Sequence, residues 1–469
     1  MPDDVTNARV RRGAKLGKLV AGQAVRGAGV SLAVVRAGDE ERAARTERAL
    51  VAAAEDIVTV LGSMKGLAMK AGQLLSMFDP LEALGQTNIP PQQRERFQRK
   101  LSELCDRAPA VPFAKMRAVL EADYGRPLAE VFARFDADPV GAASIGQVYR
   151  ARLHDGREVA VKVQYPGIDV AVRADAKNLA LLMRMMRVVT PVLDDNALFR
   201  EISSHFVDEI DYRVEAENHL AMSELYREHP FIRVPAVVPE LSTAHVLVSE
   251  FAEGVRFEEI VAMPGPVRDR VGEIVFRFFV GSMLRFRHFT GDPHPGNVLL
   301  APDGAVVFLD FGLVKHMDSA AVDFEMDCVR AAADFRAADL RALLVGYGVL
   351  DQDSPATADE CLRLFHELSG WLLADADIRI PADAVSTALY ALIDPRRGNF
   401  DRWRDQYAPA EHAFARRVEY GTLALLSKLG AGGNWHRIGR EWVHGDDPAT
   451  ELGVLERDWL ARAQTDTGS

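Results

Sequence analysis

The chain has 469 residues, of which 48% are hydrophobic and 26% are charged. These values are typical of a globular protein with about two or three domains, or of one kinase-sized unit with additions. The net charge of −12 argues against a general nucleic-acid-binding protein. Three isolated cysteines argue against a disulfide framework or zinc site and fit a reducing cytoplasm. We expect neither a secretory signal nor a transmembrane helix, because no basic-then-apolar start and no sufficiently long apolar run are seen.

The first 108 residues predict a helical extension. Residues 1–36 carry far more basic than acidic side chains. We favour a partly disordered or solvated helix here, and the alternative is contact with a membrane surface or an acidic partner. Residues 39–78 have helical composition and apolar spacing. Lys70 and Gln73 lie three residues apart and therefore on one helix face. From the pattern alone, Lys70 is interpreted as a surface lysine whose aliphatic stem packs on apolar neighbours.

A glycine-containing loop follows, leading into a predicted strand. Kinase phosphate loops read Gly-x-Gly-x-x-Gly-x-Val, and Ala143 stands here at the middle glycine, where its Cβ narrows the approach of phosphate to the backbone. The candidate nucleotide-binding residues of the loop are Gly141, Ala142, Ala143, Ser144, Gly146, Gln147 and Val148. Asp155 and Gly156 then predict a hairpin turn. Lys162 lies on the return strand, 157–163, where a kinase carries its phosphate-binding lysine.

A helix predicted over residues 196–227 contains five carboxylates between 208 and 217. Phe206, Ile210 and Val214 are expected to form its buried stripe. Glu215 is the candidate ion-pair partner of Lys162. The alternative interpretation, a solvated acidic face, accounts for some of these carboxylates.

Short strands are predicted at 234–238 and 245–251, and a turn follows at 252–254. In a kinase, this second strand leads into the hinge, where adenine meets backbone groups. Glu250 is therefore a candidate nucleotide-binding residue. An apolar helix is expected over residues 267–288.

The pattern Asp-x4-Asn followed by Asp-Phe-Gly occurs once, at Asp292, Asn297 and Asp310. A turn at 301–304 lies between two short apolar runs and predicts a tight hairpin. This hairpin would bring Asn297 and Asp310 together, with Asp292 close by. Two oxygen ligands beside a carboxylate suit Mg²⁺ on nucleotide phosphates and a base for an accepting hydroxyl. The alternative is an ordinary polar turn and hairpin.

Beyond Gly312 the protein-kinase pattern ends, because no Ala-Pro-Glu motif follows. Helices are predicted at 318–350, 357–374, 382–393 and 408–429. The residues from 430 onward are rich in Gly and Asp, and we expect this tail to fray at its end.

Several of these motifs occur together in one known family. The chain resembles the UbiB/AarF group of atypical protein-kinase-like proteins, which includes the mitochondrial coenzyme Q kinases, over residues 50–350. Lys70–Gln73 matches the family's Lys-x-Gly-Gln motif, and residues 142–148 match its alanine-containing loop. Glu209 and Asp211 match its Glu-x-Asp motif. The stretches 292–297 and 310–312 match its catalytic and metal-binding segments.

The resemblance implies an α+β, two-lobed kinase-like fold with an N-terminal helical extension and a helical C-terminal region. The domains would be 1–108 (extension), 109–254 (N-lobe), 255–350 (C-lobe core) and 351–469 (C-terminal helices).

The resemblance also implies roles for single residues. Lys70 and Gln73 would lie near the nucleotide or block the protein-substrate groove, and Glu209 and Asp211 would lie near them. Lys162, paired with Glu215, would hold phosphates. Asn297 and Asp310 would bind Mg²⁺, and Asp292 would take the place of the catalytic base. Thr290 is a departure, because family members often have histidine there to orient the loop.

The leading hypothesis is an ATP- and Mg²⁺-dependent atypical kinase or ATPase that supports quinone or isoprenoid-lipid metabolism. The expected location is cytoplasmic, with peripheral contact at the inner face of the membrane through a lipid or quinone-like partner, and no nucleic-acid partner is expected. One alternative is a small-molecule phosphotransferase of the aminoglycoside or choline kinase type, which shares the Gly-Asp-x-His-x-x-Asn loop. Another is a nucleotide-binding pseudokinase scaffold. The phosphoryl acceptor and the oligomeric state are not encoded in these patterns.

Overall fold

The computed structural model describes residues 111–143, 145–170, 172, 210–385, 387–388 and 409–466. These residues belong almost entirely to one compact unit, formed by Val111–Pro166 and Arg200–Ser469. The predicted extension 1–108, with Lys70 and Gln73, lies outside the described residues, as do Ser144 and Glu209.

An antiparallel four-stranded sheet forms the first part of this unit. Its strands, in spatial order, are β1 (Arg134–Ala143), β2 (Gly146–Arg152), β3 (Glu158–Gln164) and β5 (Val246–Glu250). Side chains alternate between the two faces of a strand. The apolar residues of β3 (Val159, Val161 and Val163) therefore share one face, where they join Tyr149 in a buried cluster.

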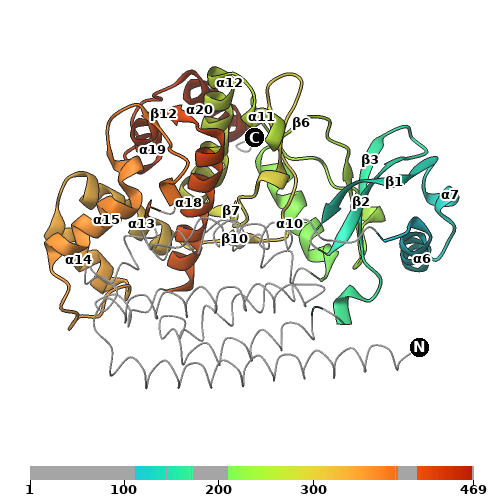
Figure 1. Ribbon diagram of the computed structural model, residues 1–469, viewed down its shortest axis with the longest axis horizontal. Coiled ribbons are helices and arrows are strands. Elements are labelled where there is room, and N and C mark those ends of the chain that lie inside the picture. The colour runs from blue at the N-terminus through green and yellow to red at the C-terminus, as the bar shows by residue number, and fades with distance from the viewer. Residues whose placement is uncertain are drawn as a thin grey trace, which may run out of the picture. The chain divides into compact units, whose positions relative to one another are not determined.

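Two helices cover the apolar face of the sheet. They are α6 (Phe113–Tyr124) and the short α7 (Leu128–Val131), and both lie beside β1–β3 in Figure 1. Met116 and Leu120 of α6 are fully buried in the same cluster as the β3 valines. Lys162 points to the opposite face because it alternates with these valines, so the pattern of β3 decides which face carries charge.

The helix predicted over 196–227 is α10, and it begins only at Tyr212 and ends at Leu225. The prediction was wrong at its described start, because Asp211 caps the helix by accepting a hydrogen bond from the backbone N–H of Arg213. Such a side-chain bond competes with helical pairing and marks a helix boundary. Of the predicted buried stripe, Ile210 is buried as expected and Phe206 lies outside the described residues, but Val214 is wrong, because it is 40% exposed. The buried face of α10 carries Glu215 and His219 instead.

A second four-stranded sheet, in the order β4-β9-β8-β6, contains the predicted hairpin. Its strands are β4 (Ile232–Arg233), β6 (Val255–Arg256), β8 (Val298–Leu300) and β9 (Val306–Phe308). The strand predicted at 234–238 is therefore displaced to 232–233, and only Val237 keeps a bridge, to Ser249. Pro235 lacks the N–H that a continuous ladder would need.

Helices form the remainder of the unit and gather at the end opposite the first sheet (Figure 1). They are α11 (Phe257–Val261), α12 (Gly265–Phe276), η3 (Arg277–Phe286, a π-helix), α13 (Ser319–Ala333), α14 (Ala337–Gly346), α15 (Ala358–Leu373), α18 (Ala410–Leu429), α19 (Trp435–Val443) and α20 (Glu451–Asp466). The single helix expected over 318–350 is divided in two at residues 334–336, where Phe335 has a φ of 56°. Most of the helix predicted at 382–393 lies outside the described residues.

The tail from residue 430 contains two helices, α19 and α20, and its last three residues, where fraying was predicted, lie outside the described residues. Trp435 is fully buried, and its ring packs 5.5 Å from that of Phe276. Arg277 is also fully buried and donates hydrogen bonds to Glu441 and Glu456, which lie in α19 and α20. These contacts join segments more than 150 residues apart, so local composition could not reveal them.

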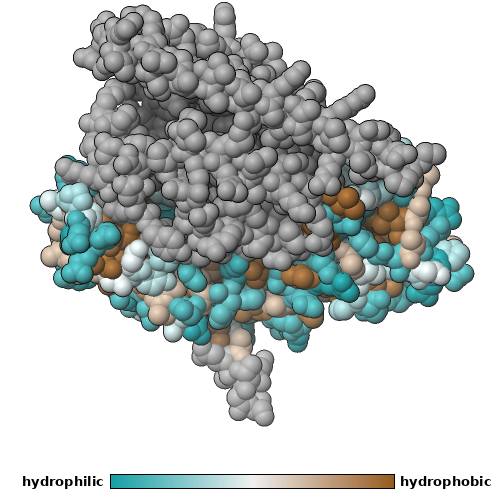
Figure 2. All heavy atoms as spheres, turned by 90° about the horizontal axis from the view of Figure 1, so that it is seen from below, coloured by the Kyte–Doolittle hydropathy of each residue, from teal (hydrophilic) through white to brown (hydrophobic). Residues whose placement is uncertain are grey.

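The surface that is not covered by grey atoms in Figure 2 is mainly hydrophilic, with hydrophobic residues scattered between. Isolated exposed apolar side chains are normal on a folded protein. Within the described ranges, no helix has both the length and the apolar character needed to cross a bilayer.

We predict that Gly146→Ala destabilises the first sheet by about 1–3 kcal/mol, the usual range for overpacking. A Cβ at position 146 would lie 2.2 Å from the carbonyl oxygen of Val163 on the neighbouring strand, and that backbone cannot move without disturbing the ladder. Gly141→Ala is the matched control, since a Cβ there meets no atom within 4 Å. Urea unfolding monitored by circular dichroism measures both variants, and equal stability of the two would contradict the packing argument.

Candidate functional site

The candidate site is built around Lys162, on the face of the first sheet opposite the apolar core. Its Nζ donates a 2.7 Å hydrogen bond to Oε1 of Glu215 in α10. A second carboxylate oxygen, Oδ2 of Asp310, lies 3.5 Å from the same nitrogen. Lys162 therefore joins three segments that are 53 and 148 residues apart in the sequence.

Burial alone would lower the pKa of Lys162, since it disfavours the charged amine. The carboxylates of Asp310 and Glu215 outweigh this effect and hold the pKa well above its ordinary value. Lys162 is therefore a cation at neutral pH. A buried, charged lysine between two carboxylates can bind an anionic group, such as a phosphate, that lies beside it.

Two contacts position α10 so that Glu215 faces Lys162. Asp211 caps the helix and pairs with Arg213 at 2.8 Å, and its side chain is 38% exposed. The buried Gln164 of β3 donates a 2.6 Å hydrogen bond from Nε2 to the carbonyl of Ile210, just before the cap. In the structure, Asp211 acts as a helix cap. Its contact with nucleotide or with the extension stays a prediction.

The predicted phosphate-loop residues are divided between the faces of the sheet. Gly141, Ala142 and Ala143 end β1, and Val148 pairs directly with Lys162 across β2 and β3. Paired residues of neighbouring strands share a face, so Val148 lies on the lysine side. Gln147 points to the opposite face, where its Oε1 accepts a hydrogen bond from the buried Tyr149 hydroxyl at 3.4 Å.

Glu250 lies at the end of β5, where the chain leaves the first sheet. It is exposed, and its backbone N–H donates to the carbonyl of Ala236 at 2.7 Å. Glu250 therefore lies where the hinge segment was expected, and its contacts with Ala236 hold the end of the strand, while its role in nucleotide binding stays a prediction.

Two short pairings hold the stretch that contains Asp292, Asn297 and Asp310. β7 (His288–Thr290) pairs antiparallel with β10 (Val314–His316), which follows the Asp-Phe-Gly segment. In the hairpin, Val298 pairs with Phe308, and the N–H of Leu309 donates to the carbonyl of Asn297 at 3.1 Å. Asn297 is therefore held opposite Leu309, one residue before Asp310.

The Asp-Phe-Gly segment is fixed further by α10. The N–H of Gly312 donates to Oδ1 of Asp310 at 3.0 Å, and Asn218 donates to the carbonyl of Phe311 at 3.2 Å. The fully buried Phe311 packs 4.5 Å from the ring of His219. Sequence reasoning missed Asn218 and His219, although their positions three and four residues after Glu215 place them on the same helix face.

Arg417 of α18 was also missed. Its Nη2 donates to Oδ1 of Asp292 at 3.1 Å. The two residues are 125 positions apart, and no local pattern connects them.

The residues present are suited to Mg²⁺ with a nucleotide. Asn297 and Asp310 both offer side-chain oxygens; Asn297 is bonded to Leu309, the residue before Asp310, and Asp310 lies 3.5 Å from the cationic Lys162. Within the described part of the chain, no cluster of three or more His, Cys, Asp or Glu could hold a metal ion. Mg²⁺ usually takes only one or two protein oxygens and completes its shell with phosphates and water, so a pair of donors is sufficient.

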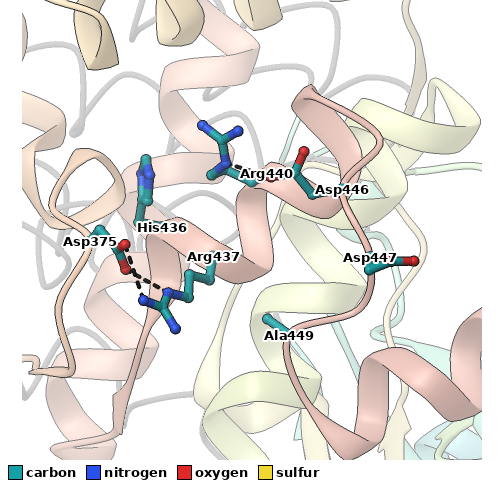
Figure 3. Close-up of a pocket in the computed structure, with 7 residues that line it drawn as sticks. All are labelled: Asp375, His436, Arg437, Arg440, Asp446, Asp447 and Ala449. Carbon is teal, nitrogen blue, oxygen red and sulfur yellow. Dashed lines mark hydrogen bonds and ion pairs between the residues drawn. The ribbon is translucent and has the colours of Figure 1, made fainter.

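A separate pocket of about 370 Å³ lies among the C-terminal helices. Figure 3 shows that its side chains come largely from α19 and from the loop that follows it. Arg437 pairs with Asp375 at 2.7 Å, and Arg440 pairs with Asp446 at 2.6 Å. The arginines are thus already neutralised within the pocket, and none of the predicted site residues lines it.

An antiparallel sheet with a lysine–glutamate pair, followed by a hairpin that bonds Asn297 to the residue before Asp310, defines a kinase-like protein of mixed α and β structure. The model of the ABC1 atypical kinase-like domain matches residues 103–342, slightly more than half of the chain. The chain belongs to this family, which is the UbiB/AarF group that the sequence motifs indicated.

Relatives and a solved structure agree with this membership. The chain is 34% identical over 282 residues to the mitochondrial atypical kinase COQ8B of Rattus norvegicus, covering 60% of this chain and 52% of the relative. It is 31% identical over 300 residues to AarF domain-containing protein kinase 1 of Xenopus laevis, covering 62% and 55%. The matched stretch thus spans about half the length of these relatives. The Rv3197–erythromycin complex of Mycobacterium tuberculosis superimposes with a TM-score of 0.59 at 30% identity, covering 83% of this chain and 95% of that chain.

We predict that His219 makes stability depend on pH. Burial, helped by the charge of Lys162, lowers the pKa of His219 from 6.5 to about 4. The imidazole is therefore neutral in the native protein, whereas the unfolded chain takes up a proton there below pH 6.5. Native stability should fall as the pH drops from 6.5 to 4, by about 3 kcal/mol in total from this group.

Urea unfolding between pH 7 and pH 4 measures this effect. His219→Gln should flatten the profile in that window, and His154→Gln, at an exposed position, should leave it unchanged. An equally steep profile for His219→Gln and the wild type would disprove the role of His219.

Proposed function

We propose that the protein is an ATP- and Mg²⁺-dependent atypical kinase or ATPase that supports quinone or isoprenoid-lipid metabolism. The observation that carries this proposal is the buried contact of Lys162 with Glu215 and Asp310, inside the region that matches the family model. A lysine in this setting is charged and fixed in position, as phosphate binding requires.

In this proposal, each site residue has its own role in binding nucleotide, holding Mg²⁺ or accepting a proton. Lys162, held by Glu215, binds the α- and β-phosphates, and Val148 with the backbone of residues 141–146 covers the nucleotide. Asn297 and Asp310 hold Mg²⁺, which neutralises phosphate charge when it is bound. Asp292 accepts the proton of the attacking hydroxyl or water, and Glu250 belongs to the hinge that meets adenine. For Lys70, Gln73 and Glu209, which lie outside the described residues, and for Asp211, a role in restricting access to the site is proposed from the family resemblance alone.

The proposed lobes follow from the same arrangement. The first sheet with α6, α7 and α10 forms an N-lobe within 109–254, and the hairpin with α11 to α14 forms a C-lobe core within 255–350. Residues 1–108 form the extension, and residues 351–469 form a C-terminal helical region. The short turn at 252–254 connects the proposed lobes.

The lipid connection rests on family membership and on sequence. The relative from Rattus norvegicus is named as a mitochondrial atypical kinase. In the present chain, the first 36 residues are strongly basic and suit a peripheral contact with an acidic membrane surface. We propose a lipid or a quinone-like small molecule as the partner that this contact delivers to the site.

We predict that ATP with Mg²⁺ binds in the micromolar range, which corresponds to about −7 to −8 kcal/mol, and raises the melting temperature. Asp310→Asn should abolish the Mg²⁺-dependent part of the shift, because it removes an anionic ligand. Asp303→Asn, in the turn at the other end of the same hairpin, is the matched control and should retain the shift. A native protein that shows no shift, or an Asp310→Asn variant that shifts fully, would refute nucleotide binding at this site.

We further predict that ATP turnover rises strongly when acidic liposomes and phenols resembling quinone headgroups are added. The physical reason is that a screened site without a protein-substrate platform is better suited to a lipid-delivered ligand than to a peptide. Turnover is measured with the wild type and with Asp292→Asn, which should remain inactive in both conditions. Efficient phosphorylation of a generic peptide would favour an ordinary protein kinase instead, and turnover of small alcohols would favour a small-molecule phosphotransferase.

A further inference from the structure

Helix α18 reaches the proposed catalytic loop through Arg417. The Nε of Arg417 donates a 2.7 Å hydrogen bond to the carbonyl oxygen of Gly291, and its Nη2 donates a 3.1 Å hydrogen bond to Oδ1 of Asp292. One planar guanidinium thus holds both the backbone and the carboxylate of two successive residues. The fixed geometry of its donors makes such a contact more directional than a lysine contact would be.

The contact is well shielded. The side chain of Arg417 is 23% exposed, and that of Asp292 is 14% exposed. One turn earlier on α18, the ring of Phe414 would lie 3.3 Å from a Cβ placed on Gly291. The helix therefore packs directly against the start of the loop, and the Arg417 contact is not a surface ion pair between mobile side chains.

Helix α18 is itself held firmly from the side of α13 and α15. Arg416 pairs with the buried Glu325 of α13 at 2.6 Å, and His412 contacts the same carboxylate at 2.6 Å. Ser369 of α15 donates a 2.5 Å hydrogen bond to the buried Glu419. Because α18 is fixed by contacts to both α13 and α15, it can hold the Arg417 side chain in one position.

The loop has a weaker local support. Thr290, where family members often have histidine, offers its Oγ1 to the N–H of Asp292 at 3.5 Å, which is long for a hydrogen bond. The N–H of Gly291 donates to the carbonyl of Leu313 at 2.7 Å, but this bond fixes the backbone only. Arg417 adds a direct contact to the Asp292 carboxylate itself.

We propose that Arg417 is a positioning residue that orients Asp292 for phosphoryl transfer from a helix outside the matched kinase-like domain. This proposal rests on the proposed function, because Asp292 must be the residue that meets the acceptor. In this proposal Arg417 acts through Gly291 and Asp292, which it contacts directly, and not through the phosphate-binding Lys162. Its loss should therefore impair turnover and leave nucleotide binding intact.

The test is the full-length Arg417→Gln variant, assayed for ATP turnover with acidic liposomes and for Mg²⁺-ATP binding by thermal shift. We expect kcat to fall about 10- to 100-fold, as is typical when a reacting group is misplaced by about 1 Å, with the nucleotide dissociation constant within about twofold of the wild type. Arg417→Lys, which keeps the charge but not the two-donor geometry, should recover part of kcat. Arg457→Gln, at an exposed arginine of α20, should behave like the wild type.

A second measurement does not need activity. Hydrogen exchange of peptides spanning residues 288–297 should become faster in Arg417→Gln and stay unchanged in Arg457→Gln.

Two results would overturn the role of Arg417: an unchanged kcat in Arg417→Gln, or unchanged hydrogen exchange of the loop. Failure of the proposed function is recognised separately. In that case the wild type neither binds nor turns over Mg²⁺-ATP, and faster loop exchange in Arg417→Gln would still report the positioning contact. If Arg417→Gln does not fold, Arg417→Lys decides the question by the same two measurements.

Discussion

The position of Lys162 between Glu215 and Asp310 is the constraint on which the arrangement of the site depends. The Lys162 side chain is only 16% exposed, and an ammonium group so largely removed from water is unfavourable unless carboxylates compensate it; the buried carboxylate of Glu215 has the same requirement. The first sheet, α10 and the Asp-Phe-Gly segment must therefore meet at one point. The cap at Asp211 and the hydrogen bond from Gln164 direct α10 toward that point. The Asp211 cap and the Gln164 hydrogen bond, each of ordinary strength, thus determine which carboxylate faces the charged group of Lys162.

The part of the site formed by the hairpin depends on packing against η3 and the C-terminal helices. The hairpin strand β9 is held by η3, where the rings of Phe278 and Phe308 stack at 3.6 Å. The buried Arg277, at the start of η3, is bonded in turn to Glu441 and Glu456 of the last two helices. Together with Arg417, these contacts show that the C-terminal helices support the hairpin and the catalytic loop. The structural unit of the site is therefore larger than the region matched by the family model.

Much of the site could be predicted because its residues occur in short patterns with defined spacing. The alternation along β3 places Lys162 opposite the valines, and the turn at 301–304 sets the register that brings Asn297 near Asp310. The start of α10 was misjudged because a single side-chain cap at Asp211 overrides helical composition. The face of the sheet to which Gln147 points could not be predicted, because it is set by the pairing of β2 with β3 and not by the sequence of one strand.

The sequence by itself determined the family, the first sheet, the hairpin and the identity of the charged residues, because each of these depends on local periodicity or on motif spacing. The sequence also named Glu215 as the partner of Lys162, which the structure confirms. Only the tertiary structure decided that Asp310 joins this pair, that His219 is buried against Phe311, and that Arg417 holds Asp292. It also decided that the Gly- and Asp-rich tail forms helices around Trp435. The physical reason is common to all of these features. Burial and charge pairing are set by segments that are distant in the chain, and their energies appear only when those segments come together.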